Sequence, residues 1–536
     1  MLEGRGTPRH QLPDPEVFTG GVPRARVAAG TFGFLAAWSR MWEETAQDLQ
    51  QEGGTDMHPL KELMNPSSIA IYGASNNPLK MGSIQLANIL ECGYRGEVYP
   101  IHRSEERVMG IPAYRSIAEV GKPVDLVQIV LPTDAVPGIM EECGKAGVRR
   151  AIVISGGFKE TRGEEGDRRE RELKEIAARY GMRFLGPNCV GVMNSLRSLN
   201  TTTIADPPMG GGIALASQSG AYTAMINPYL RSQGVKLCQT ISVGNEADID
   251  LADCLEYFRL QEEVRAVGMY VETVRRPRDF IAAARRTVAE KPVVAVYVGG
   301  TEAGSRSSLS HTGAITGPDG LYDGLFRQAG IIRAWDMDEM IDMLWILALQ
   351  PPPPGPRMAV ITNSGGPGSS LAYHLEKAGL SVPLFSGSLR EKLGGITGPL
   401  TYTGNPIDLT FETNVFIFKD LLETVFDSGE VDGAFIYGVF GAPDFMVNLE
   451  KRFPELRALE EDWGEVYHRF LAELSEVPRR SRKPLVVMSF FGSQSDSIRT
   501  LVENDVPVYP SAARSSRAMR ALLEYREIRR RLGGEC

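Results

Sequence analysis

Short apolar segments that end in turns of small residues recur along this chain of 536 residues, with helix-forming segments between many of them. Each apolar segment has the length of a buried strand, and strands that alternate with helices pair in parallel. The pattern therefore predicts an α/β protein built from doubly wound parallel sheets. The strands expected first are Ser68–Tyr72, Glu97–Ile101, Asp125–Leu131, Arg150–Ile154 and Met182–Leu185.

The same pattern occurs twice more. A second group of strands is expected at Gly212–Ala216, Leu237–Val243, Val264–Tyr270, Val293–Val298 and Ile331–Ala334. Residues 351–356 are almost all proline, which cannot continue a helix or a central strand, so this segment is expected to be a semi-rigid linker. A third group is expected at Arg357–Thr362, Gly433–Val439, Pro484–Phe490 and Val506–Tyr509.

One hydrophobic core does not grow to this size, and the length suggests three or four domains. The three groups of strands indicate three successive domains. Their predicted ranges are 61–205, 206–350 and 357–536. Residues 1–60 are expected to form a leader with one amphipathic helix over Phe32–Gln51, either a docking arm or a surface helix. The segment 444–482 is long for its domain.

The charge balance argues against nucleic acid as the main partner. The formal net charge is −9, whereas binding to a duplex needs clustered Lys and Arg. There is no apolar run of membrane-spanning length and no signal-peptide pattern at the N-terminus. The six cysteines include no CxxC pair, so neither a zinc site nor a disulfide framework is indicated. We expect a cytoplasmic protein with reduced thiols.

The first expected strand runs into Gly73, Ala74 and Ser75, and Lys80 follows before a helix. A helix start aims free N–H groups at a bound phosphate, and Lys80 would add positive charge. The turn is not GxGxxG, so the standard dinucleotide fingerprint is absent. It is interpreted as a phosphate loop, with a plain strand-to-helix turn as the alternative.

Two more loops follow expected strands. Gly186, Asn188 and Cys189 lie at the carboxyl edge of a sheet, where ligands of open α/β sheets bind. The sequence offers no base near Cys189, so a packed thiol is favoured over a nucleophile. The segment Ser219–Ala221 begins a helix and suits either a phosphate oxygen or an ordinary helix cap.

His311 is one of only six histidines, and Ser, Thr and Gly surround it. Neutral imidazole can accept a phosphoryl group, and small neighbours leave room for one. Glu272 ends another expected strand, where its carboxylate could orient and stabilise an imidazolium. A third glycine loop follows Thr362, and the segment Asn405–Leu409 is expected to face it.

Seven segments in order, GASxxPxKxG, GPNCVG, SQSGA, SVGNEADID, SHTGAI, NSGGPG and NPIDL, resemble the α subunit of NDP-forming acyl-CoA ligases. The ADP-forming acetate–CoA ligase α subunit is the nearer relative, and succinyl-CoA synthetase α the wider one. The resemblance covers about Pro66 to Tyr509. It implies a Rossmann-like CoA-binding domain followed by two flavodoxin-like ligase domains.

The resemblance also implies a mechanism. Acyl-CoA and phosphate give acyl phosphate and CoA, the phosphoryl group passes to a histidine, and phosphohistidine phosphorylates ADP or GDP. His311 matches that histidine, and Glu272 matches the glutamate that supports it. The CoA-binding positions implied are Gly73, Ala74, Ser75, Lys80, Pro132, Gly186 and Asn188, and the positions facing the phosphohistidine are Ser219, Gly220 and Ala221.

No segment resembles an ATP-grasp domain. The resemblance therefore implies a separate ATP-grasp β subunit that binds the nucleotide with Mg²⁺, in an α2β2-type hetero-oligomer. The acyl group is not indicated. The chain departs from the family pattern at Ile101-His102-Arg103, where Asn-Pro-Lys is usual, and at Tyr373 and His374, where an Asp is expected.

Two other functions stay open at this point. The first is a CoA-binding protein of the same fold without turnover, which the presence of both His311 and Glu272 argues against. The second is an NAD-dependent dehydrogenase built on the first domain. That alternative lacks GxGxxG, and Glu105 and Glu106 come late for a ribose-binding acid after the second strand.

Overall fold

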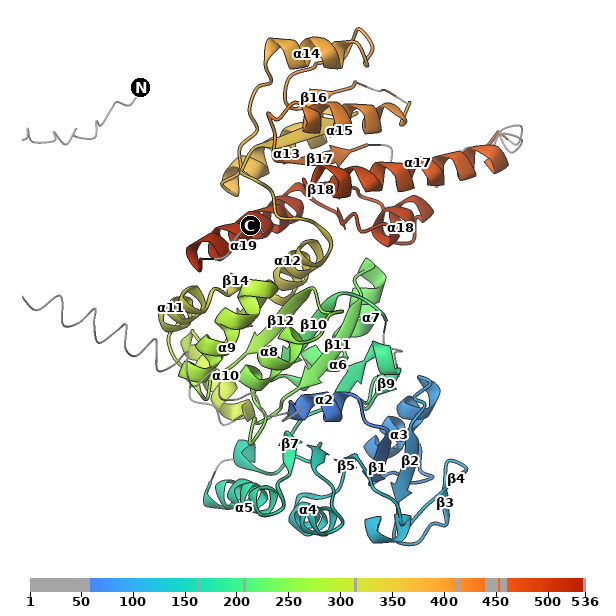
Figure 1. Ribbon diagram of the computed structural model, residues 1–536, viewed down its shortest axis with the longest axis vertical. Helices are drawn as coiled ribbons and strands as arrows, with labels where there is room; N and C mark the ends of the chain where they lie inside the picture. Colours follow the sequence, from blue (N-terminus) through green and yellow to red (C-terminus); the bar gives the residue numbers. More distant parts are fainter. Residues whose placement is uncertain are drawn as a thin grey trace, which may run out of the picture. The chain divides into compact units, whose positions relative to one another are not determined.

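The computed structural model describes residues 58–161, 163–205, 209–312, 316–410, 412, 414–438, 452–453 and 460–533. For residues 224, 308–312 and 460–463 it describes the backbone alone. Figure 1 traces three sheets in chain order, from blue through green to red. The helix expected over Phe32–Gln51 lies outside the described residues. None of the helices in the described ranges is both long and apolar enough to cross a bilayer.

The first sheet has five parallel strands in the order β2-β1-β5-β6-β7. Every expected strand is present, within a few residues of its predicted ends, and all the residues of β1 and β5 are buried. The strands are β1 (Ser68–Tyr72), β2 (Glu97–Ile101), β5 (Leu126–Ile129), β6 (Arg150–Val153) and β7 (Arg183–Leu185). A short hairpin, β3 (Arg107–Val108) and β4 (Ile111–Pro112), lies outside this sheet. The helices are α2 (Pro59–Met64), α3 (Met81–Glu91), α4 (Val136–Lys145) and α5 (Glu164–Tyr180).

The second sheet has the order β14-β13-β12-β10-β11-β8-β9. Its five expected strands are parallel, namely β10 (Ile213–Ser217), β11 (Leu237–Ser242), β12 (Ala266–Val271), β13 (Val293–Tyr297) and β14 (Ile332–Ala334). Two unexpected strands, β8 (Val192–Asn194) and β9 (Leu199–Asn200), extend it in antiparallel pairing. They come from the range assigned to the first domain, so sheet membership changes before the predicted boundary at 205, and the domain ranges remain predictions.

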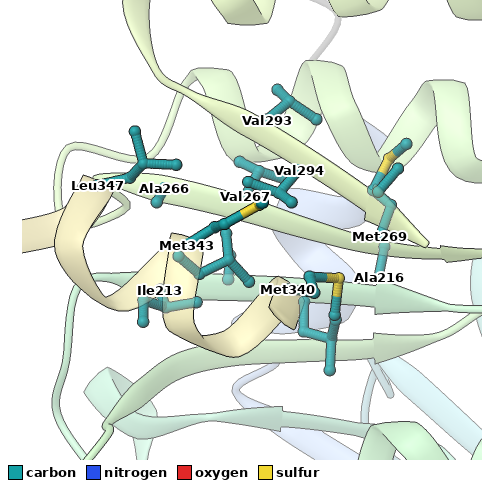
Figure 2. Packing of buried hydrophobic residues seen from close by; sticks show 14 of the residues in the cluster. Ile213, Ala216, Ala266, Val267, Met269, Val293, Val294, Met340, Met343 and Leu347 are labelled. Carbon is teal, nitrogen blue, oxygen red and sulfur yellow. The ribbon is translucent and has the colours of Figure 1, made fainter. Parts of the chain in front are cut away.

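The helices of the second sheet are α6 (Gly220–Ala224), α7 (Ile226–Gln233), α8 (Leu251–Arg259), α9 (Pro277–Glu290), α10 (Glu302–Thr312), α11 (Asp319–Ala329) and α12 (Met337–Leu349). Figure 2 shows Met340, Met343 and Leu347 of α12 against strand residues that include Ile213 and Val267. The other side of α12 packs on the C-terminal helix α19 (Ala512–Arg531). Because α12 is covered on two sides, it is apolar nearly all round.

The third sheet is again parallel, with the order β16-β15-β17-β18-β19. Its strands are β15 (Met358–Thr362), β16 (Ile407–Asp408), β17 (Gly433–Tyr437), β18 (Leu485–Met488) and β19 (Val508–Tyr509). Besides α19, its helices are α13 (Gly365–Lys377), α14 (Gly387–Gly394), α15 (Ile417–Asp427), α17 (Glu460–Ser481) and α18 (Asp496–Glu503). Of the long segment 444–482, the part in α17 is described and most of the rest lies outside the described residues.

Candidate active site

In each sheet, the chain builds outward in opposite directions from one strand, and one of the expected loops directly follows that strand. β1 lies between β2 and β5, β10 between β11 and β12, and β15 between β16 and β17. Ligands of open α/β sheets bind outside the carboxyl ends of the strands at such a reversal. The loops that begin at Gly73, Gln218 and Asn363 therefore lie where this rule places a site.

The turn at Gly73 needs glycine. Its φ is +101°, and a β-carbon there would lie 2.0 Å from the Val130 carbonyl oxygen. A β-carbon on Gly82 would lie 2.6 Å from the Gly73 oxygen, so α3 begins directly against the turn. Lys80 is the exposed N-cap residue of α3, and its side chain makes no capping hydrogen bond. This arrangement suits a phosphate beside Lys80.

The other two residues of this loop are buried. Ala74 is fully buried, and Ser75 is 3% exposed. The Ser75 N–H donates to Ser83 Oγ at 3.0 Å, and that hydroxyl donates back to the Ser75 carbonyl at 2.8 Å. The N–H and carbonyl groups of Ser75 are therefore both hydrogen-bonded to Ser83, and these bonds stabilise the turn.

The ends of β1, β5 and β6 meet at one edge of the first sheet. The Val130 N–H donates to the Tyr72 carbonyl at 2.9 Å, and Pro132 caps the short 3-10 helix Thr133–Ala135. Thr133 Oγ1 donates to the Gly156 carbonyl at 2.5 Å. Pro132 and the Gly73 turn thus lie at the same sheet edge.

The loop after β7 contains Gly186, Asn188 and Cys189. A β-carbon on Gly186, whose φ is +93°, would lie 2.4 Å from the Val153 oxygen. The Asn188 N–H donates to the Ser155 carbonyl at 2.9 Å, which fixes the loop on the first sheet. Cys189 is 4% exposed, and burial raises the pKa of its thiol to about 12. The interpretation of Cys189 as a packed thiol is confirmed.

The helix α6 starts against this loop. A β-carbon on Gly220 would lie 2.5 Å from Val190 Cγ1, so a larger residue would push the two apart. Ser219 is the N-cap residue, and its N–H donates to Ser217 Oγ at 3.0 Å. Ala221 is exposed in the first turn. The structure therefore brings the expected phosphate-facing residues next to the loop that contains Asn188.

Glu272 directly follows β12 and is 4% exposed. The side chain of Gln218, which follows β10, forms hydrogen bonds with the backbone of Glu272 and Thr273. Gln218 Oε1 accepts from the Glu272 N–H at 2.5 Å and the Thr273 N–H at 3.1 Å, and its Nε2 donates to the Thr273 carbonyl at 2.9 Å. The sequence reasoning did not assign a role to Gln218, although it lies in the SQSGA segment.

A second buried carboxyl group lies behind Gln218. Glu246, 3% exposed, accepts from Gln218 Nε2 at 2.7 Å and from the Leu251 N–H at 3.0 Å. Burial, with Asp250 adding to it, raises the pKa of Glu246 to about 8. Arg275 Nε lies 3.7 Å from Glu246 Oε2 and opposes this shift. The sequence pattern gave Glu246 no role, because nothing in SVGNEADID shows which charged residue is buried.

The loops of the first and second sheets are joined by side chains. Asn188 Nδ2 donates to Asn245 Oδ1 at 3.2 Å, and Asn245 Nδ2 donates to Glu160 Oε2 at 2.6 Å. Arg275 Nη2 donates to the Asn245 carbonyl. The loop expected to bind CoA is therefore connected, through Asn245 and Arg275, to the buried group around Glu272.

His311 lies in the last turn of α10, and its side chain is outside the described residues. The segment that carries it follows β13, whose last residue, Tyr297, is in register with Val271 at the end of β12. Glu272 and the His311 segment therefore leave the sheet at the same edge. A contact between the two side chains stays a prediction.

The third glycine loop is faced by the segment that was expected to face it. β15 and β16 pair in parallel, with Thr362 in register with Asp408. Asn405 Oδ1 accepts from the Val360 N–H at 3.0 Å, and its Nδ2 donates to the Met358 carbonyl at 2.8 Å. This prediction is confirmed, and Asn405 anchors the segment to β15.

Comparison with known proteins identifies the family. Residues 67–195 match the family model of a CoA binding domain, and residues 210–347 match that of a succinyl-CoA ligase like flavodoxin domain. The α subunit of acetate–CoA ligase (ADP-forming) II from Pyrococcus furiosus is 35% identical over 469 residues, which are 87% of this chain and 97% of that subunit. The chain belongs to the α subunits of the ADP-forming acyl-CoA ligases.

Two further matches support this ligase α subunit. The 4-hydroxybutyrate–CoA ligase (ADP-forming) of Nitrosopumilus maritimus is 30% identical over 469 residues, 86% of this chain and 64% of that protein. The structure of the dinucleotide forming acetyl-coenzyme A synthetase 1 of Candidatus Korarchaeum cryptofilum, in complex with phosphate and ADP, matches with a TM-score of 0.77 and 30% identity. That match covers 89% of this chain and 99% of the other. Membership in this family argues against the NAD-dependent dehydrogenase alternative.

The described part of this ligase α subunit offers no metal site. Across the described ranges, no cluster of three or more His, Cys, Asp or Glu side chains could hold a metal ion. The described residues therefore form no preassembled cage of side chains for a metal ion.

Proposed function

We propose that this chain is the CoA-binding and phosphoryl-carrying subunit of an ADP-forming acyl-CoA ligase, with His311 as the carrier. The observation that supports it most is the placement of Glu272. A buried carboxyl group follows β12, and the segment with His311 follows the neighbouring parallel strand β13, so both leave one sheet edge.

The proposed reaction has three reversible transfers. An oxygen of inorganic phosphate attacks the thioester carbonyl, the C–S bond breaks, and acyl phosphate and CoA thiolate form. A neutral ring nitrogen of His311 attacks the phosphorus of acyl phosphate, and the P–O bond to the leaving carboxylate breaks. A terminal oxygen of ADP then attacks phosphohistidine, the P–N bond breaks, and ATP forms.

Each proposed role follows from a physical need of these transfers. Phosphoryl transfer depends mostly on positioning and on oriented dipoles. The Gly73 turn and Lys80 are proposed to bind the phosphates of CoA, with Pro132 near its adenine half and Gly186 and Asn188 near its thiol. Ser219, Gly220 and Ala221 are proposed to face the phosphoryl group, and Glu272 to stabilise the His311 imidazolium.

The nucleotide is proposed to bind, with Mg²⁺, on a separate ATP-grasp β subunit in a cytoplasmic α2β2-type assembly. The Pyrococcus relative is named as a subunit α, which supports the presence of a partner subunit. The relatives named above act on acetate and on 4-hydroxybutyrate, so the family accommodates different acyl groups.

The test uses the chain purified from its host together with any co-purifying partner. The complex is incubated with ATP labelled at the γ-phosphate and Mg²⁺, and alkali-stable phosphohistidine is mapped. We expect the label on His311 and its loss in His311→Ala, while CoA binding by calorimetry is unchanged. His468→Ala, in α17, is the matched control and should keep the label. An unlabelled His311 in the intact complex would leave a CoA-binding protein without this chemistry.

A further inference from the structure

Gln218 has every hydrogen-bonding position of its side-chain amide filled. Its oxygen accepts from two backbone N–H groups, those of Glu272 and Thr273, at 2.5 and 3.1 Å. Its nitrogen donates to the Thr273 carbonyl at 2.9 Å and to the Glu246 carboxyl at 2.7 Å. The amide has two donors and two acceptor positions, so none is spare.

The orientation of this amide has only one solution. If the group were flipped, its NH₂ would face the N–H groups of Glu272 and Thr273, and its oxygen would face the Thr273 carbonyl. Gln218 is 5% exposed, so no solvent would relieve those contacts. Glu246 accepts a hydrogen bond from the NH₂ group of Gln218. This bond stabilises the amide orientation in which Gln218 holds the backbone of Glu272.

Glu246 is itself anchored on the opposite side. Its other oxygen accepts from the Leu251 N–H at 3.0 Å, at the start of α8. Its backbone has φ of +52°, a conformation that is uncommon for glutamate and is held here by the surrounding structure. The pair therefore connects the rigid N-terminus of α8 to the residue after β12.

We propose that Gln218 and Glu246 are positioning residues for phosphoryl transfer: Glu246 orients the Gln218 amide, and Gln218 holds the backbone of Glu272. This inference rests on the proposed function, in which Glu272 supports His311. Neither residue touches the transferred group in this proposal. Because Gln218 contacts the backbone of Glu272 directly, the main effect is expected on the step at His311.

The experiment compares Gln218→Met, Glu246→Gln and the exchanged pair Gln218→Glu with Glu246→Gln in the intact complex. Methionine keeps the size of Gln218 but makes none of its four hydrogen bonds. We expect it to slow labelling of His311 about 10- to 100-fold, by analogy with the loss of a side chain that orients a metal ligand, with the KM for CoA unchanged. Gln328→Met, on an exposed position of α11, is the matched control and should label at the wild-type rate.

The exchanged pair separates positioning from general damage. It restores a donor on residue 246 facing an acceptor on residue 218, so its loss should be smaller than the product of the losses in Gln218→Glu and Glu246→Gln alone. Wild-type labelling in Gln218→Met, or losses in the exchanged pair that simply multiply, would overturn the proposal. If wild-type His311 is itself unlabelled, the proposed function fails and this inference with it.

Discussion

Tyr297 and Gly317 are joined by two hydrogen bonds that bring together the two ends of the segment containing His311. Tyr297 Oη donates to the Gly317 carbonyl at 2.6 Å and accepts from the Gly317 N–H at 3.1 Å. The Tyr297 ring stacks on Tyr322 of α11, with ring centroids 3.5 Å apart. The buried Tyr297 side chain, at the end of β13, thus fixes the backbone at Gly317, just after the segment that contains His311.

Replacing Tyr297 with phenylalanine should therefore loosen the His311 segment. The stacked ring is kept, but two backbone groups of the half-buried Gly317 lose their partner, which costs at most about 1–3 kcal/mol. We expect slower phosphohistidine formation, measured by labelling, with the KM for CoA unchanged. Tyr229→Phe, which removes from an exposed side chain a hydroxyl that donates to Asp338 at 2.7 Å, is the control. Equal labelling rates in the two variants would contradict this role.

Lys80 is predicted to bind a phosphate of CoA. Its exposed ammonium lies at the start of α3, where a hydrogen bond to a charged group contributes about 1.5–3 kcal/mol. Lys80→Ala should raise the Kd for CoA about tenfold at low salt, and the difference should shrink at high salt because the charges are screened. Lys145→Ala, an exposed lysine 3.3 Å from Glu141, is the calorimetric control. An unchanged Kd would place the phosphates elsewhere.

Asp342 and Arg514 join α12 to α19 through two hydrogen bonds of 2.7 Å each. The Asp342 side chain is 4% exposed, and burial raises the pKa of its carboxyl group, which Arg514 opposes. Arg514→Met should lower the free energy of unfolding by about 3–5 kcal/mol, because a buried carboxylate is left without its partner.

Urea unfolding measures this loss. Arg520→Met removes an exposed pair with Glu527 in the same helix and should cost at most about 1 kcal/mol. Asp342→Leu combined with Arg514→Met removes both charges and should recover much of the stability. Equal losses of unfolding free energy in Arg514→Met and Arg520→Met would contradict a larger contribution from the buried pair.

Glu246 should make stability depend on pH. Its pKa is raised to about 8 in the folded chain from 4.5, by burial and by Asp250, with Arg275 opposing. Between these two values the folded chain holds a proton that the unfolded chain has released. The free energy of unfolding should therefore fall as pH rises through this window, by about 1.4 kcal/mol per pH unit, and level off above it.

The comparison with Glu246→Gln isolates this group, since glutamine does not titrate. Urea unfolding at about pH 5 and pH 8 should show wild type losing more stability than the variant between the two. Parallel losses would mean that Glu246 is ionised in the folded chain throughout.

Much of the fold was predictable from short-range pattern. The strand at Ser68–Tyr72 was found with its observed ends, because a short apolar run that ends in glycine has few alternatives. The placement of Cys189 as a packed thiol and of Asn405–Leu409 opposite the third loop also followed from residue type and order.

The strands β8 and β9 could not be predicted as part of the second sheet. Residues 192–200 follow the first sheet directly in the chain. The pairing of β8 with β11 depends on a contact between Met193 and Thr240 that no local pattern contains, and β9 pairs with β8. The bonds from Gln218 to Glu246 and to Glu272 were missed for the same reason.

The sequence by itself determined the strand and helix types, the glycine turns, and the residue types available for phosphate and CoA, because these depend on neighbours along the chain. Only the tertiary structure decided which carboxyl groups are buried, and that Gln218 joins Glu246 to the residue that supports His311 in the proposed mechanism. Strand order sets which loops meet at a sheet edge, and burial sets which charged groups are desolvated. Both depend on residues brought together by packing.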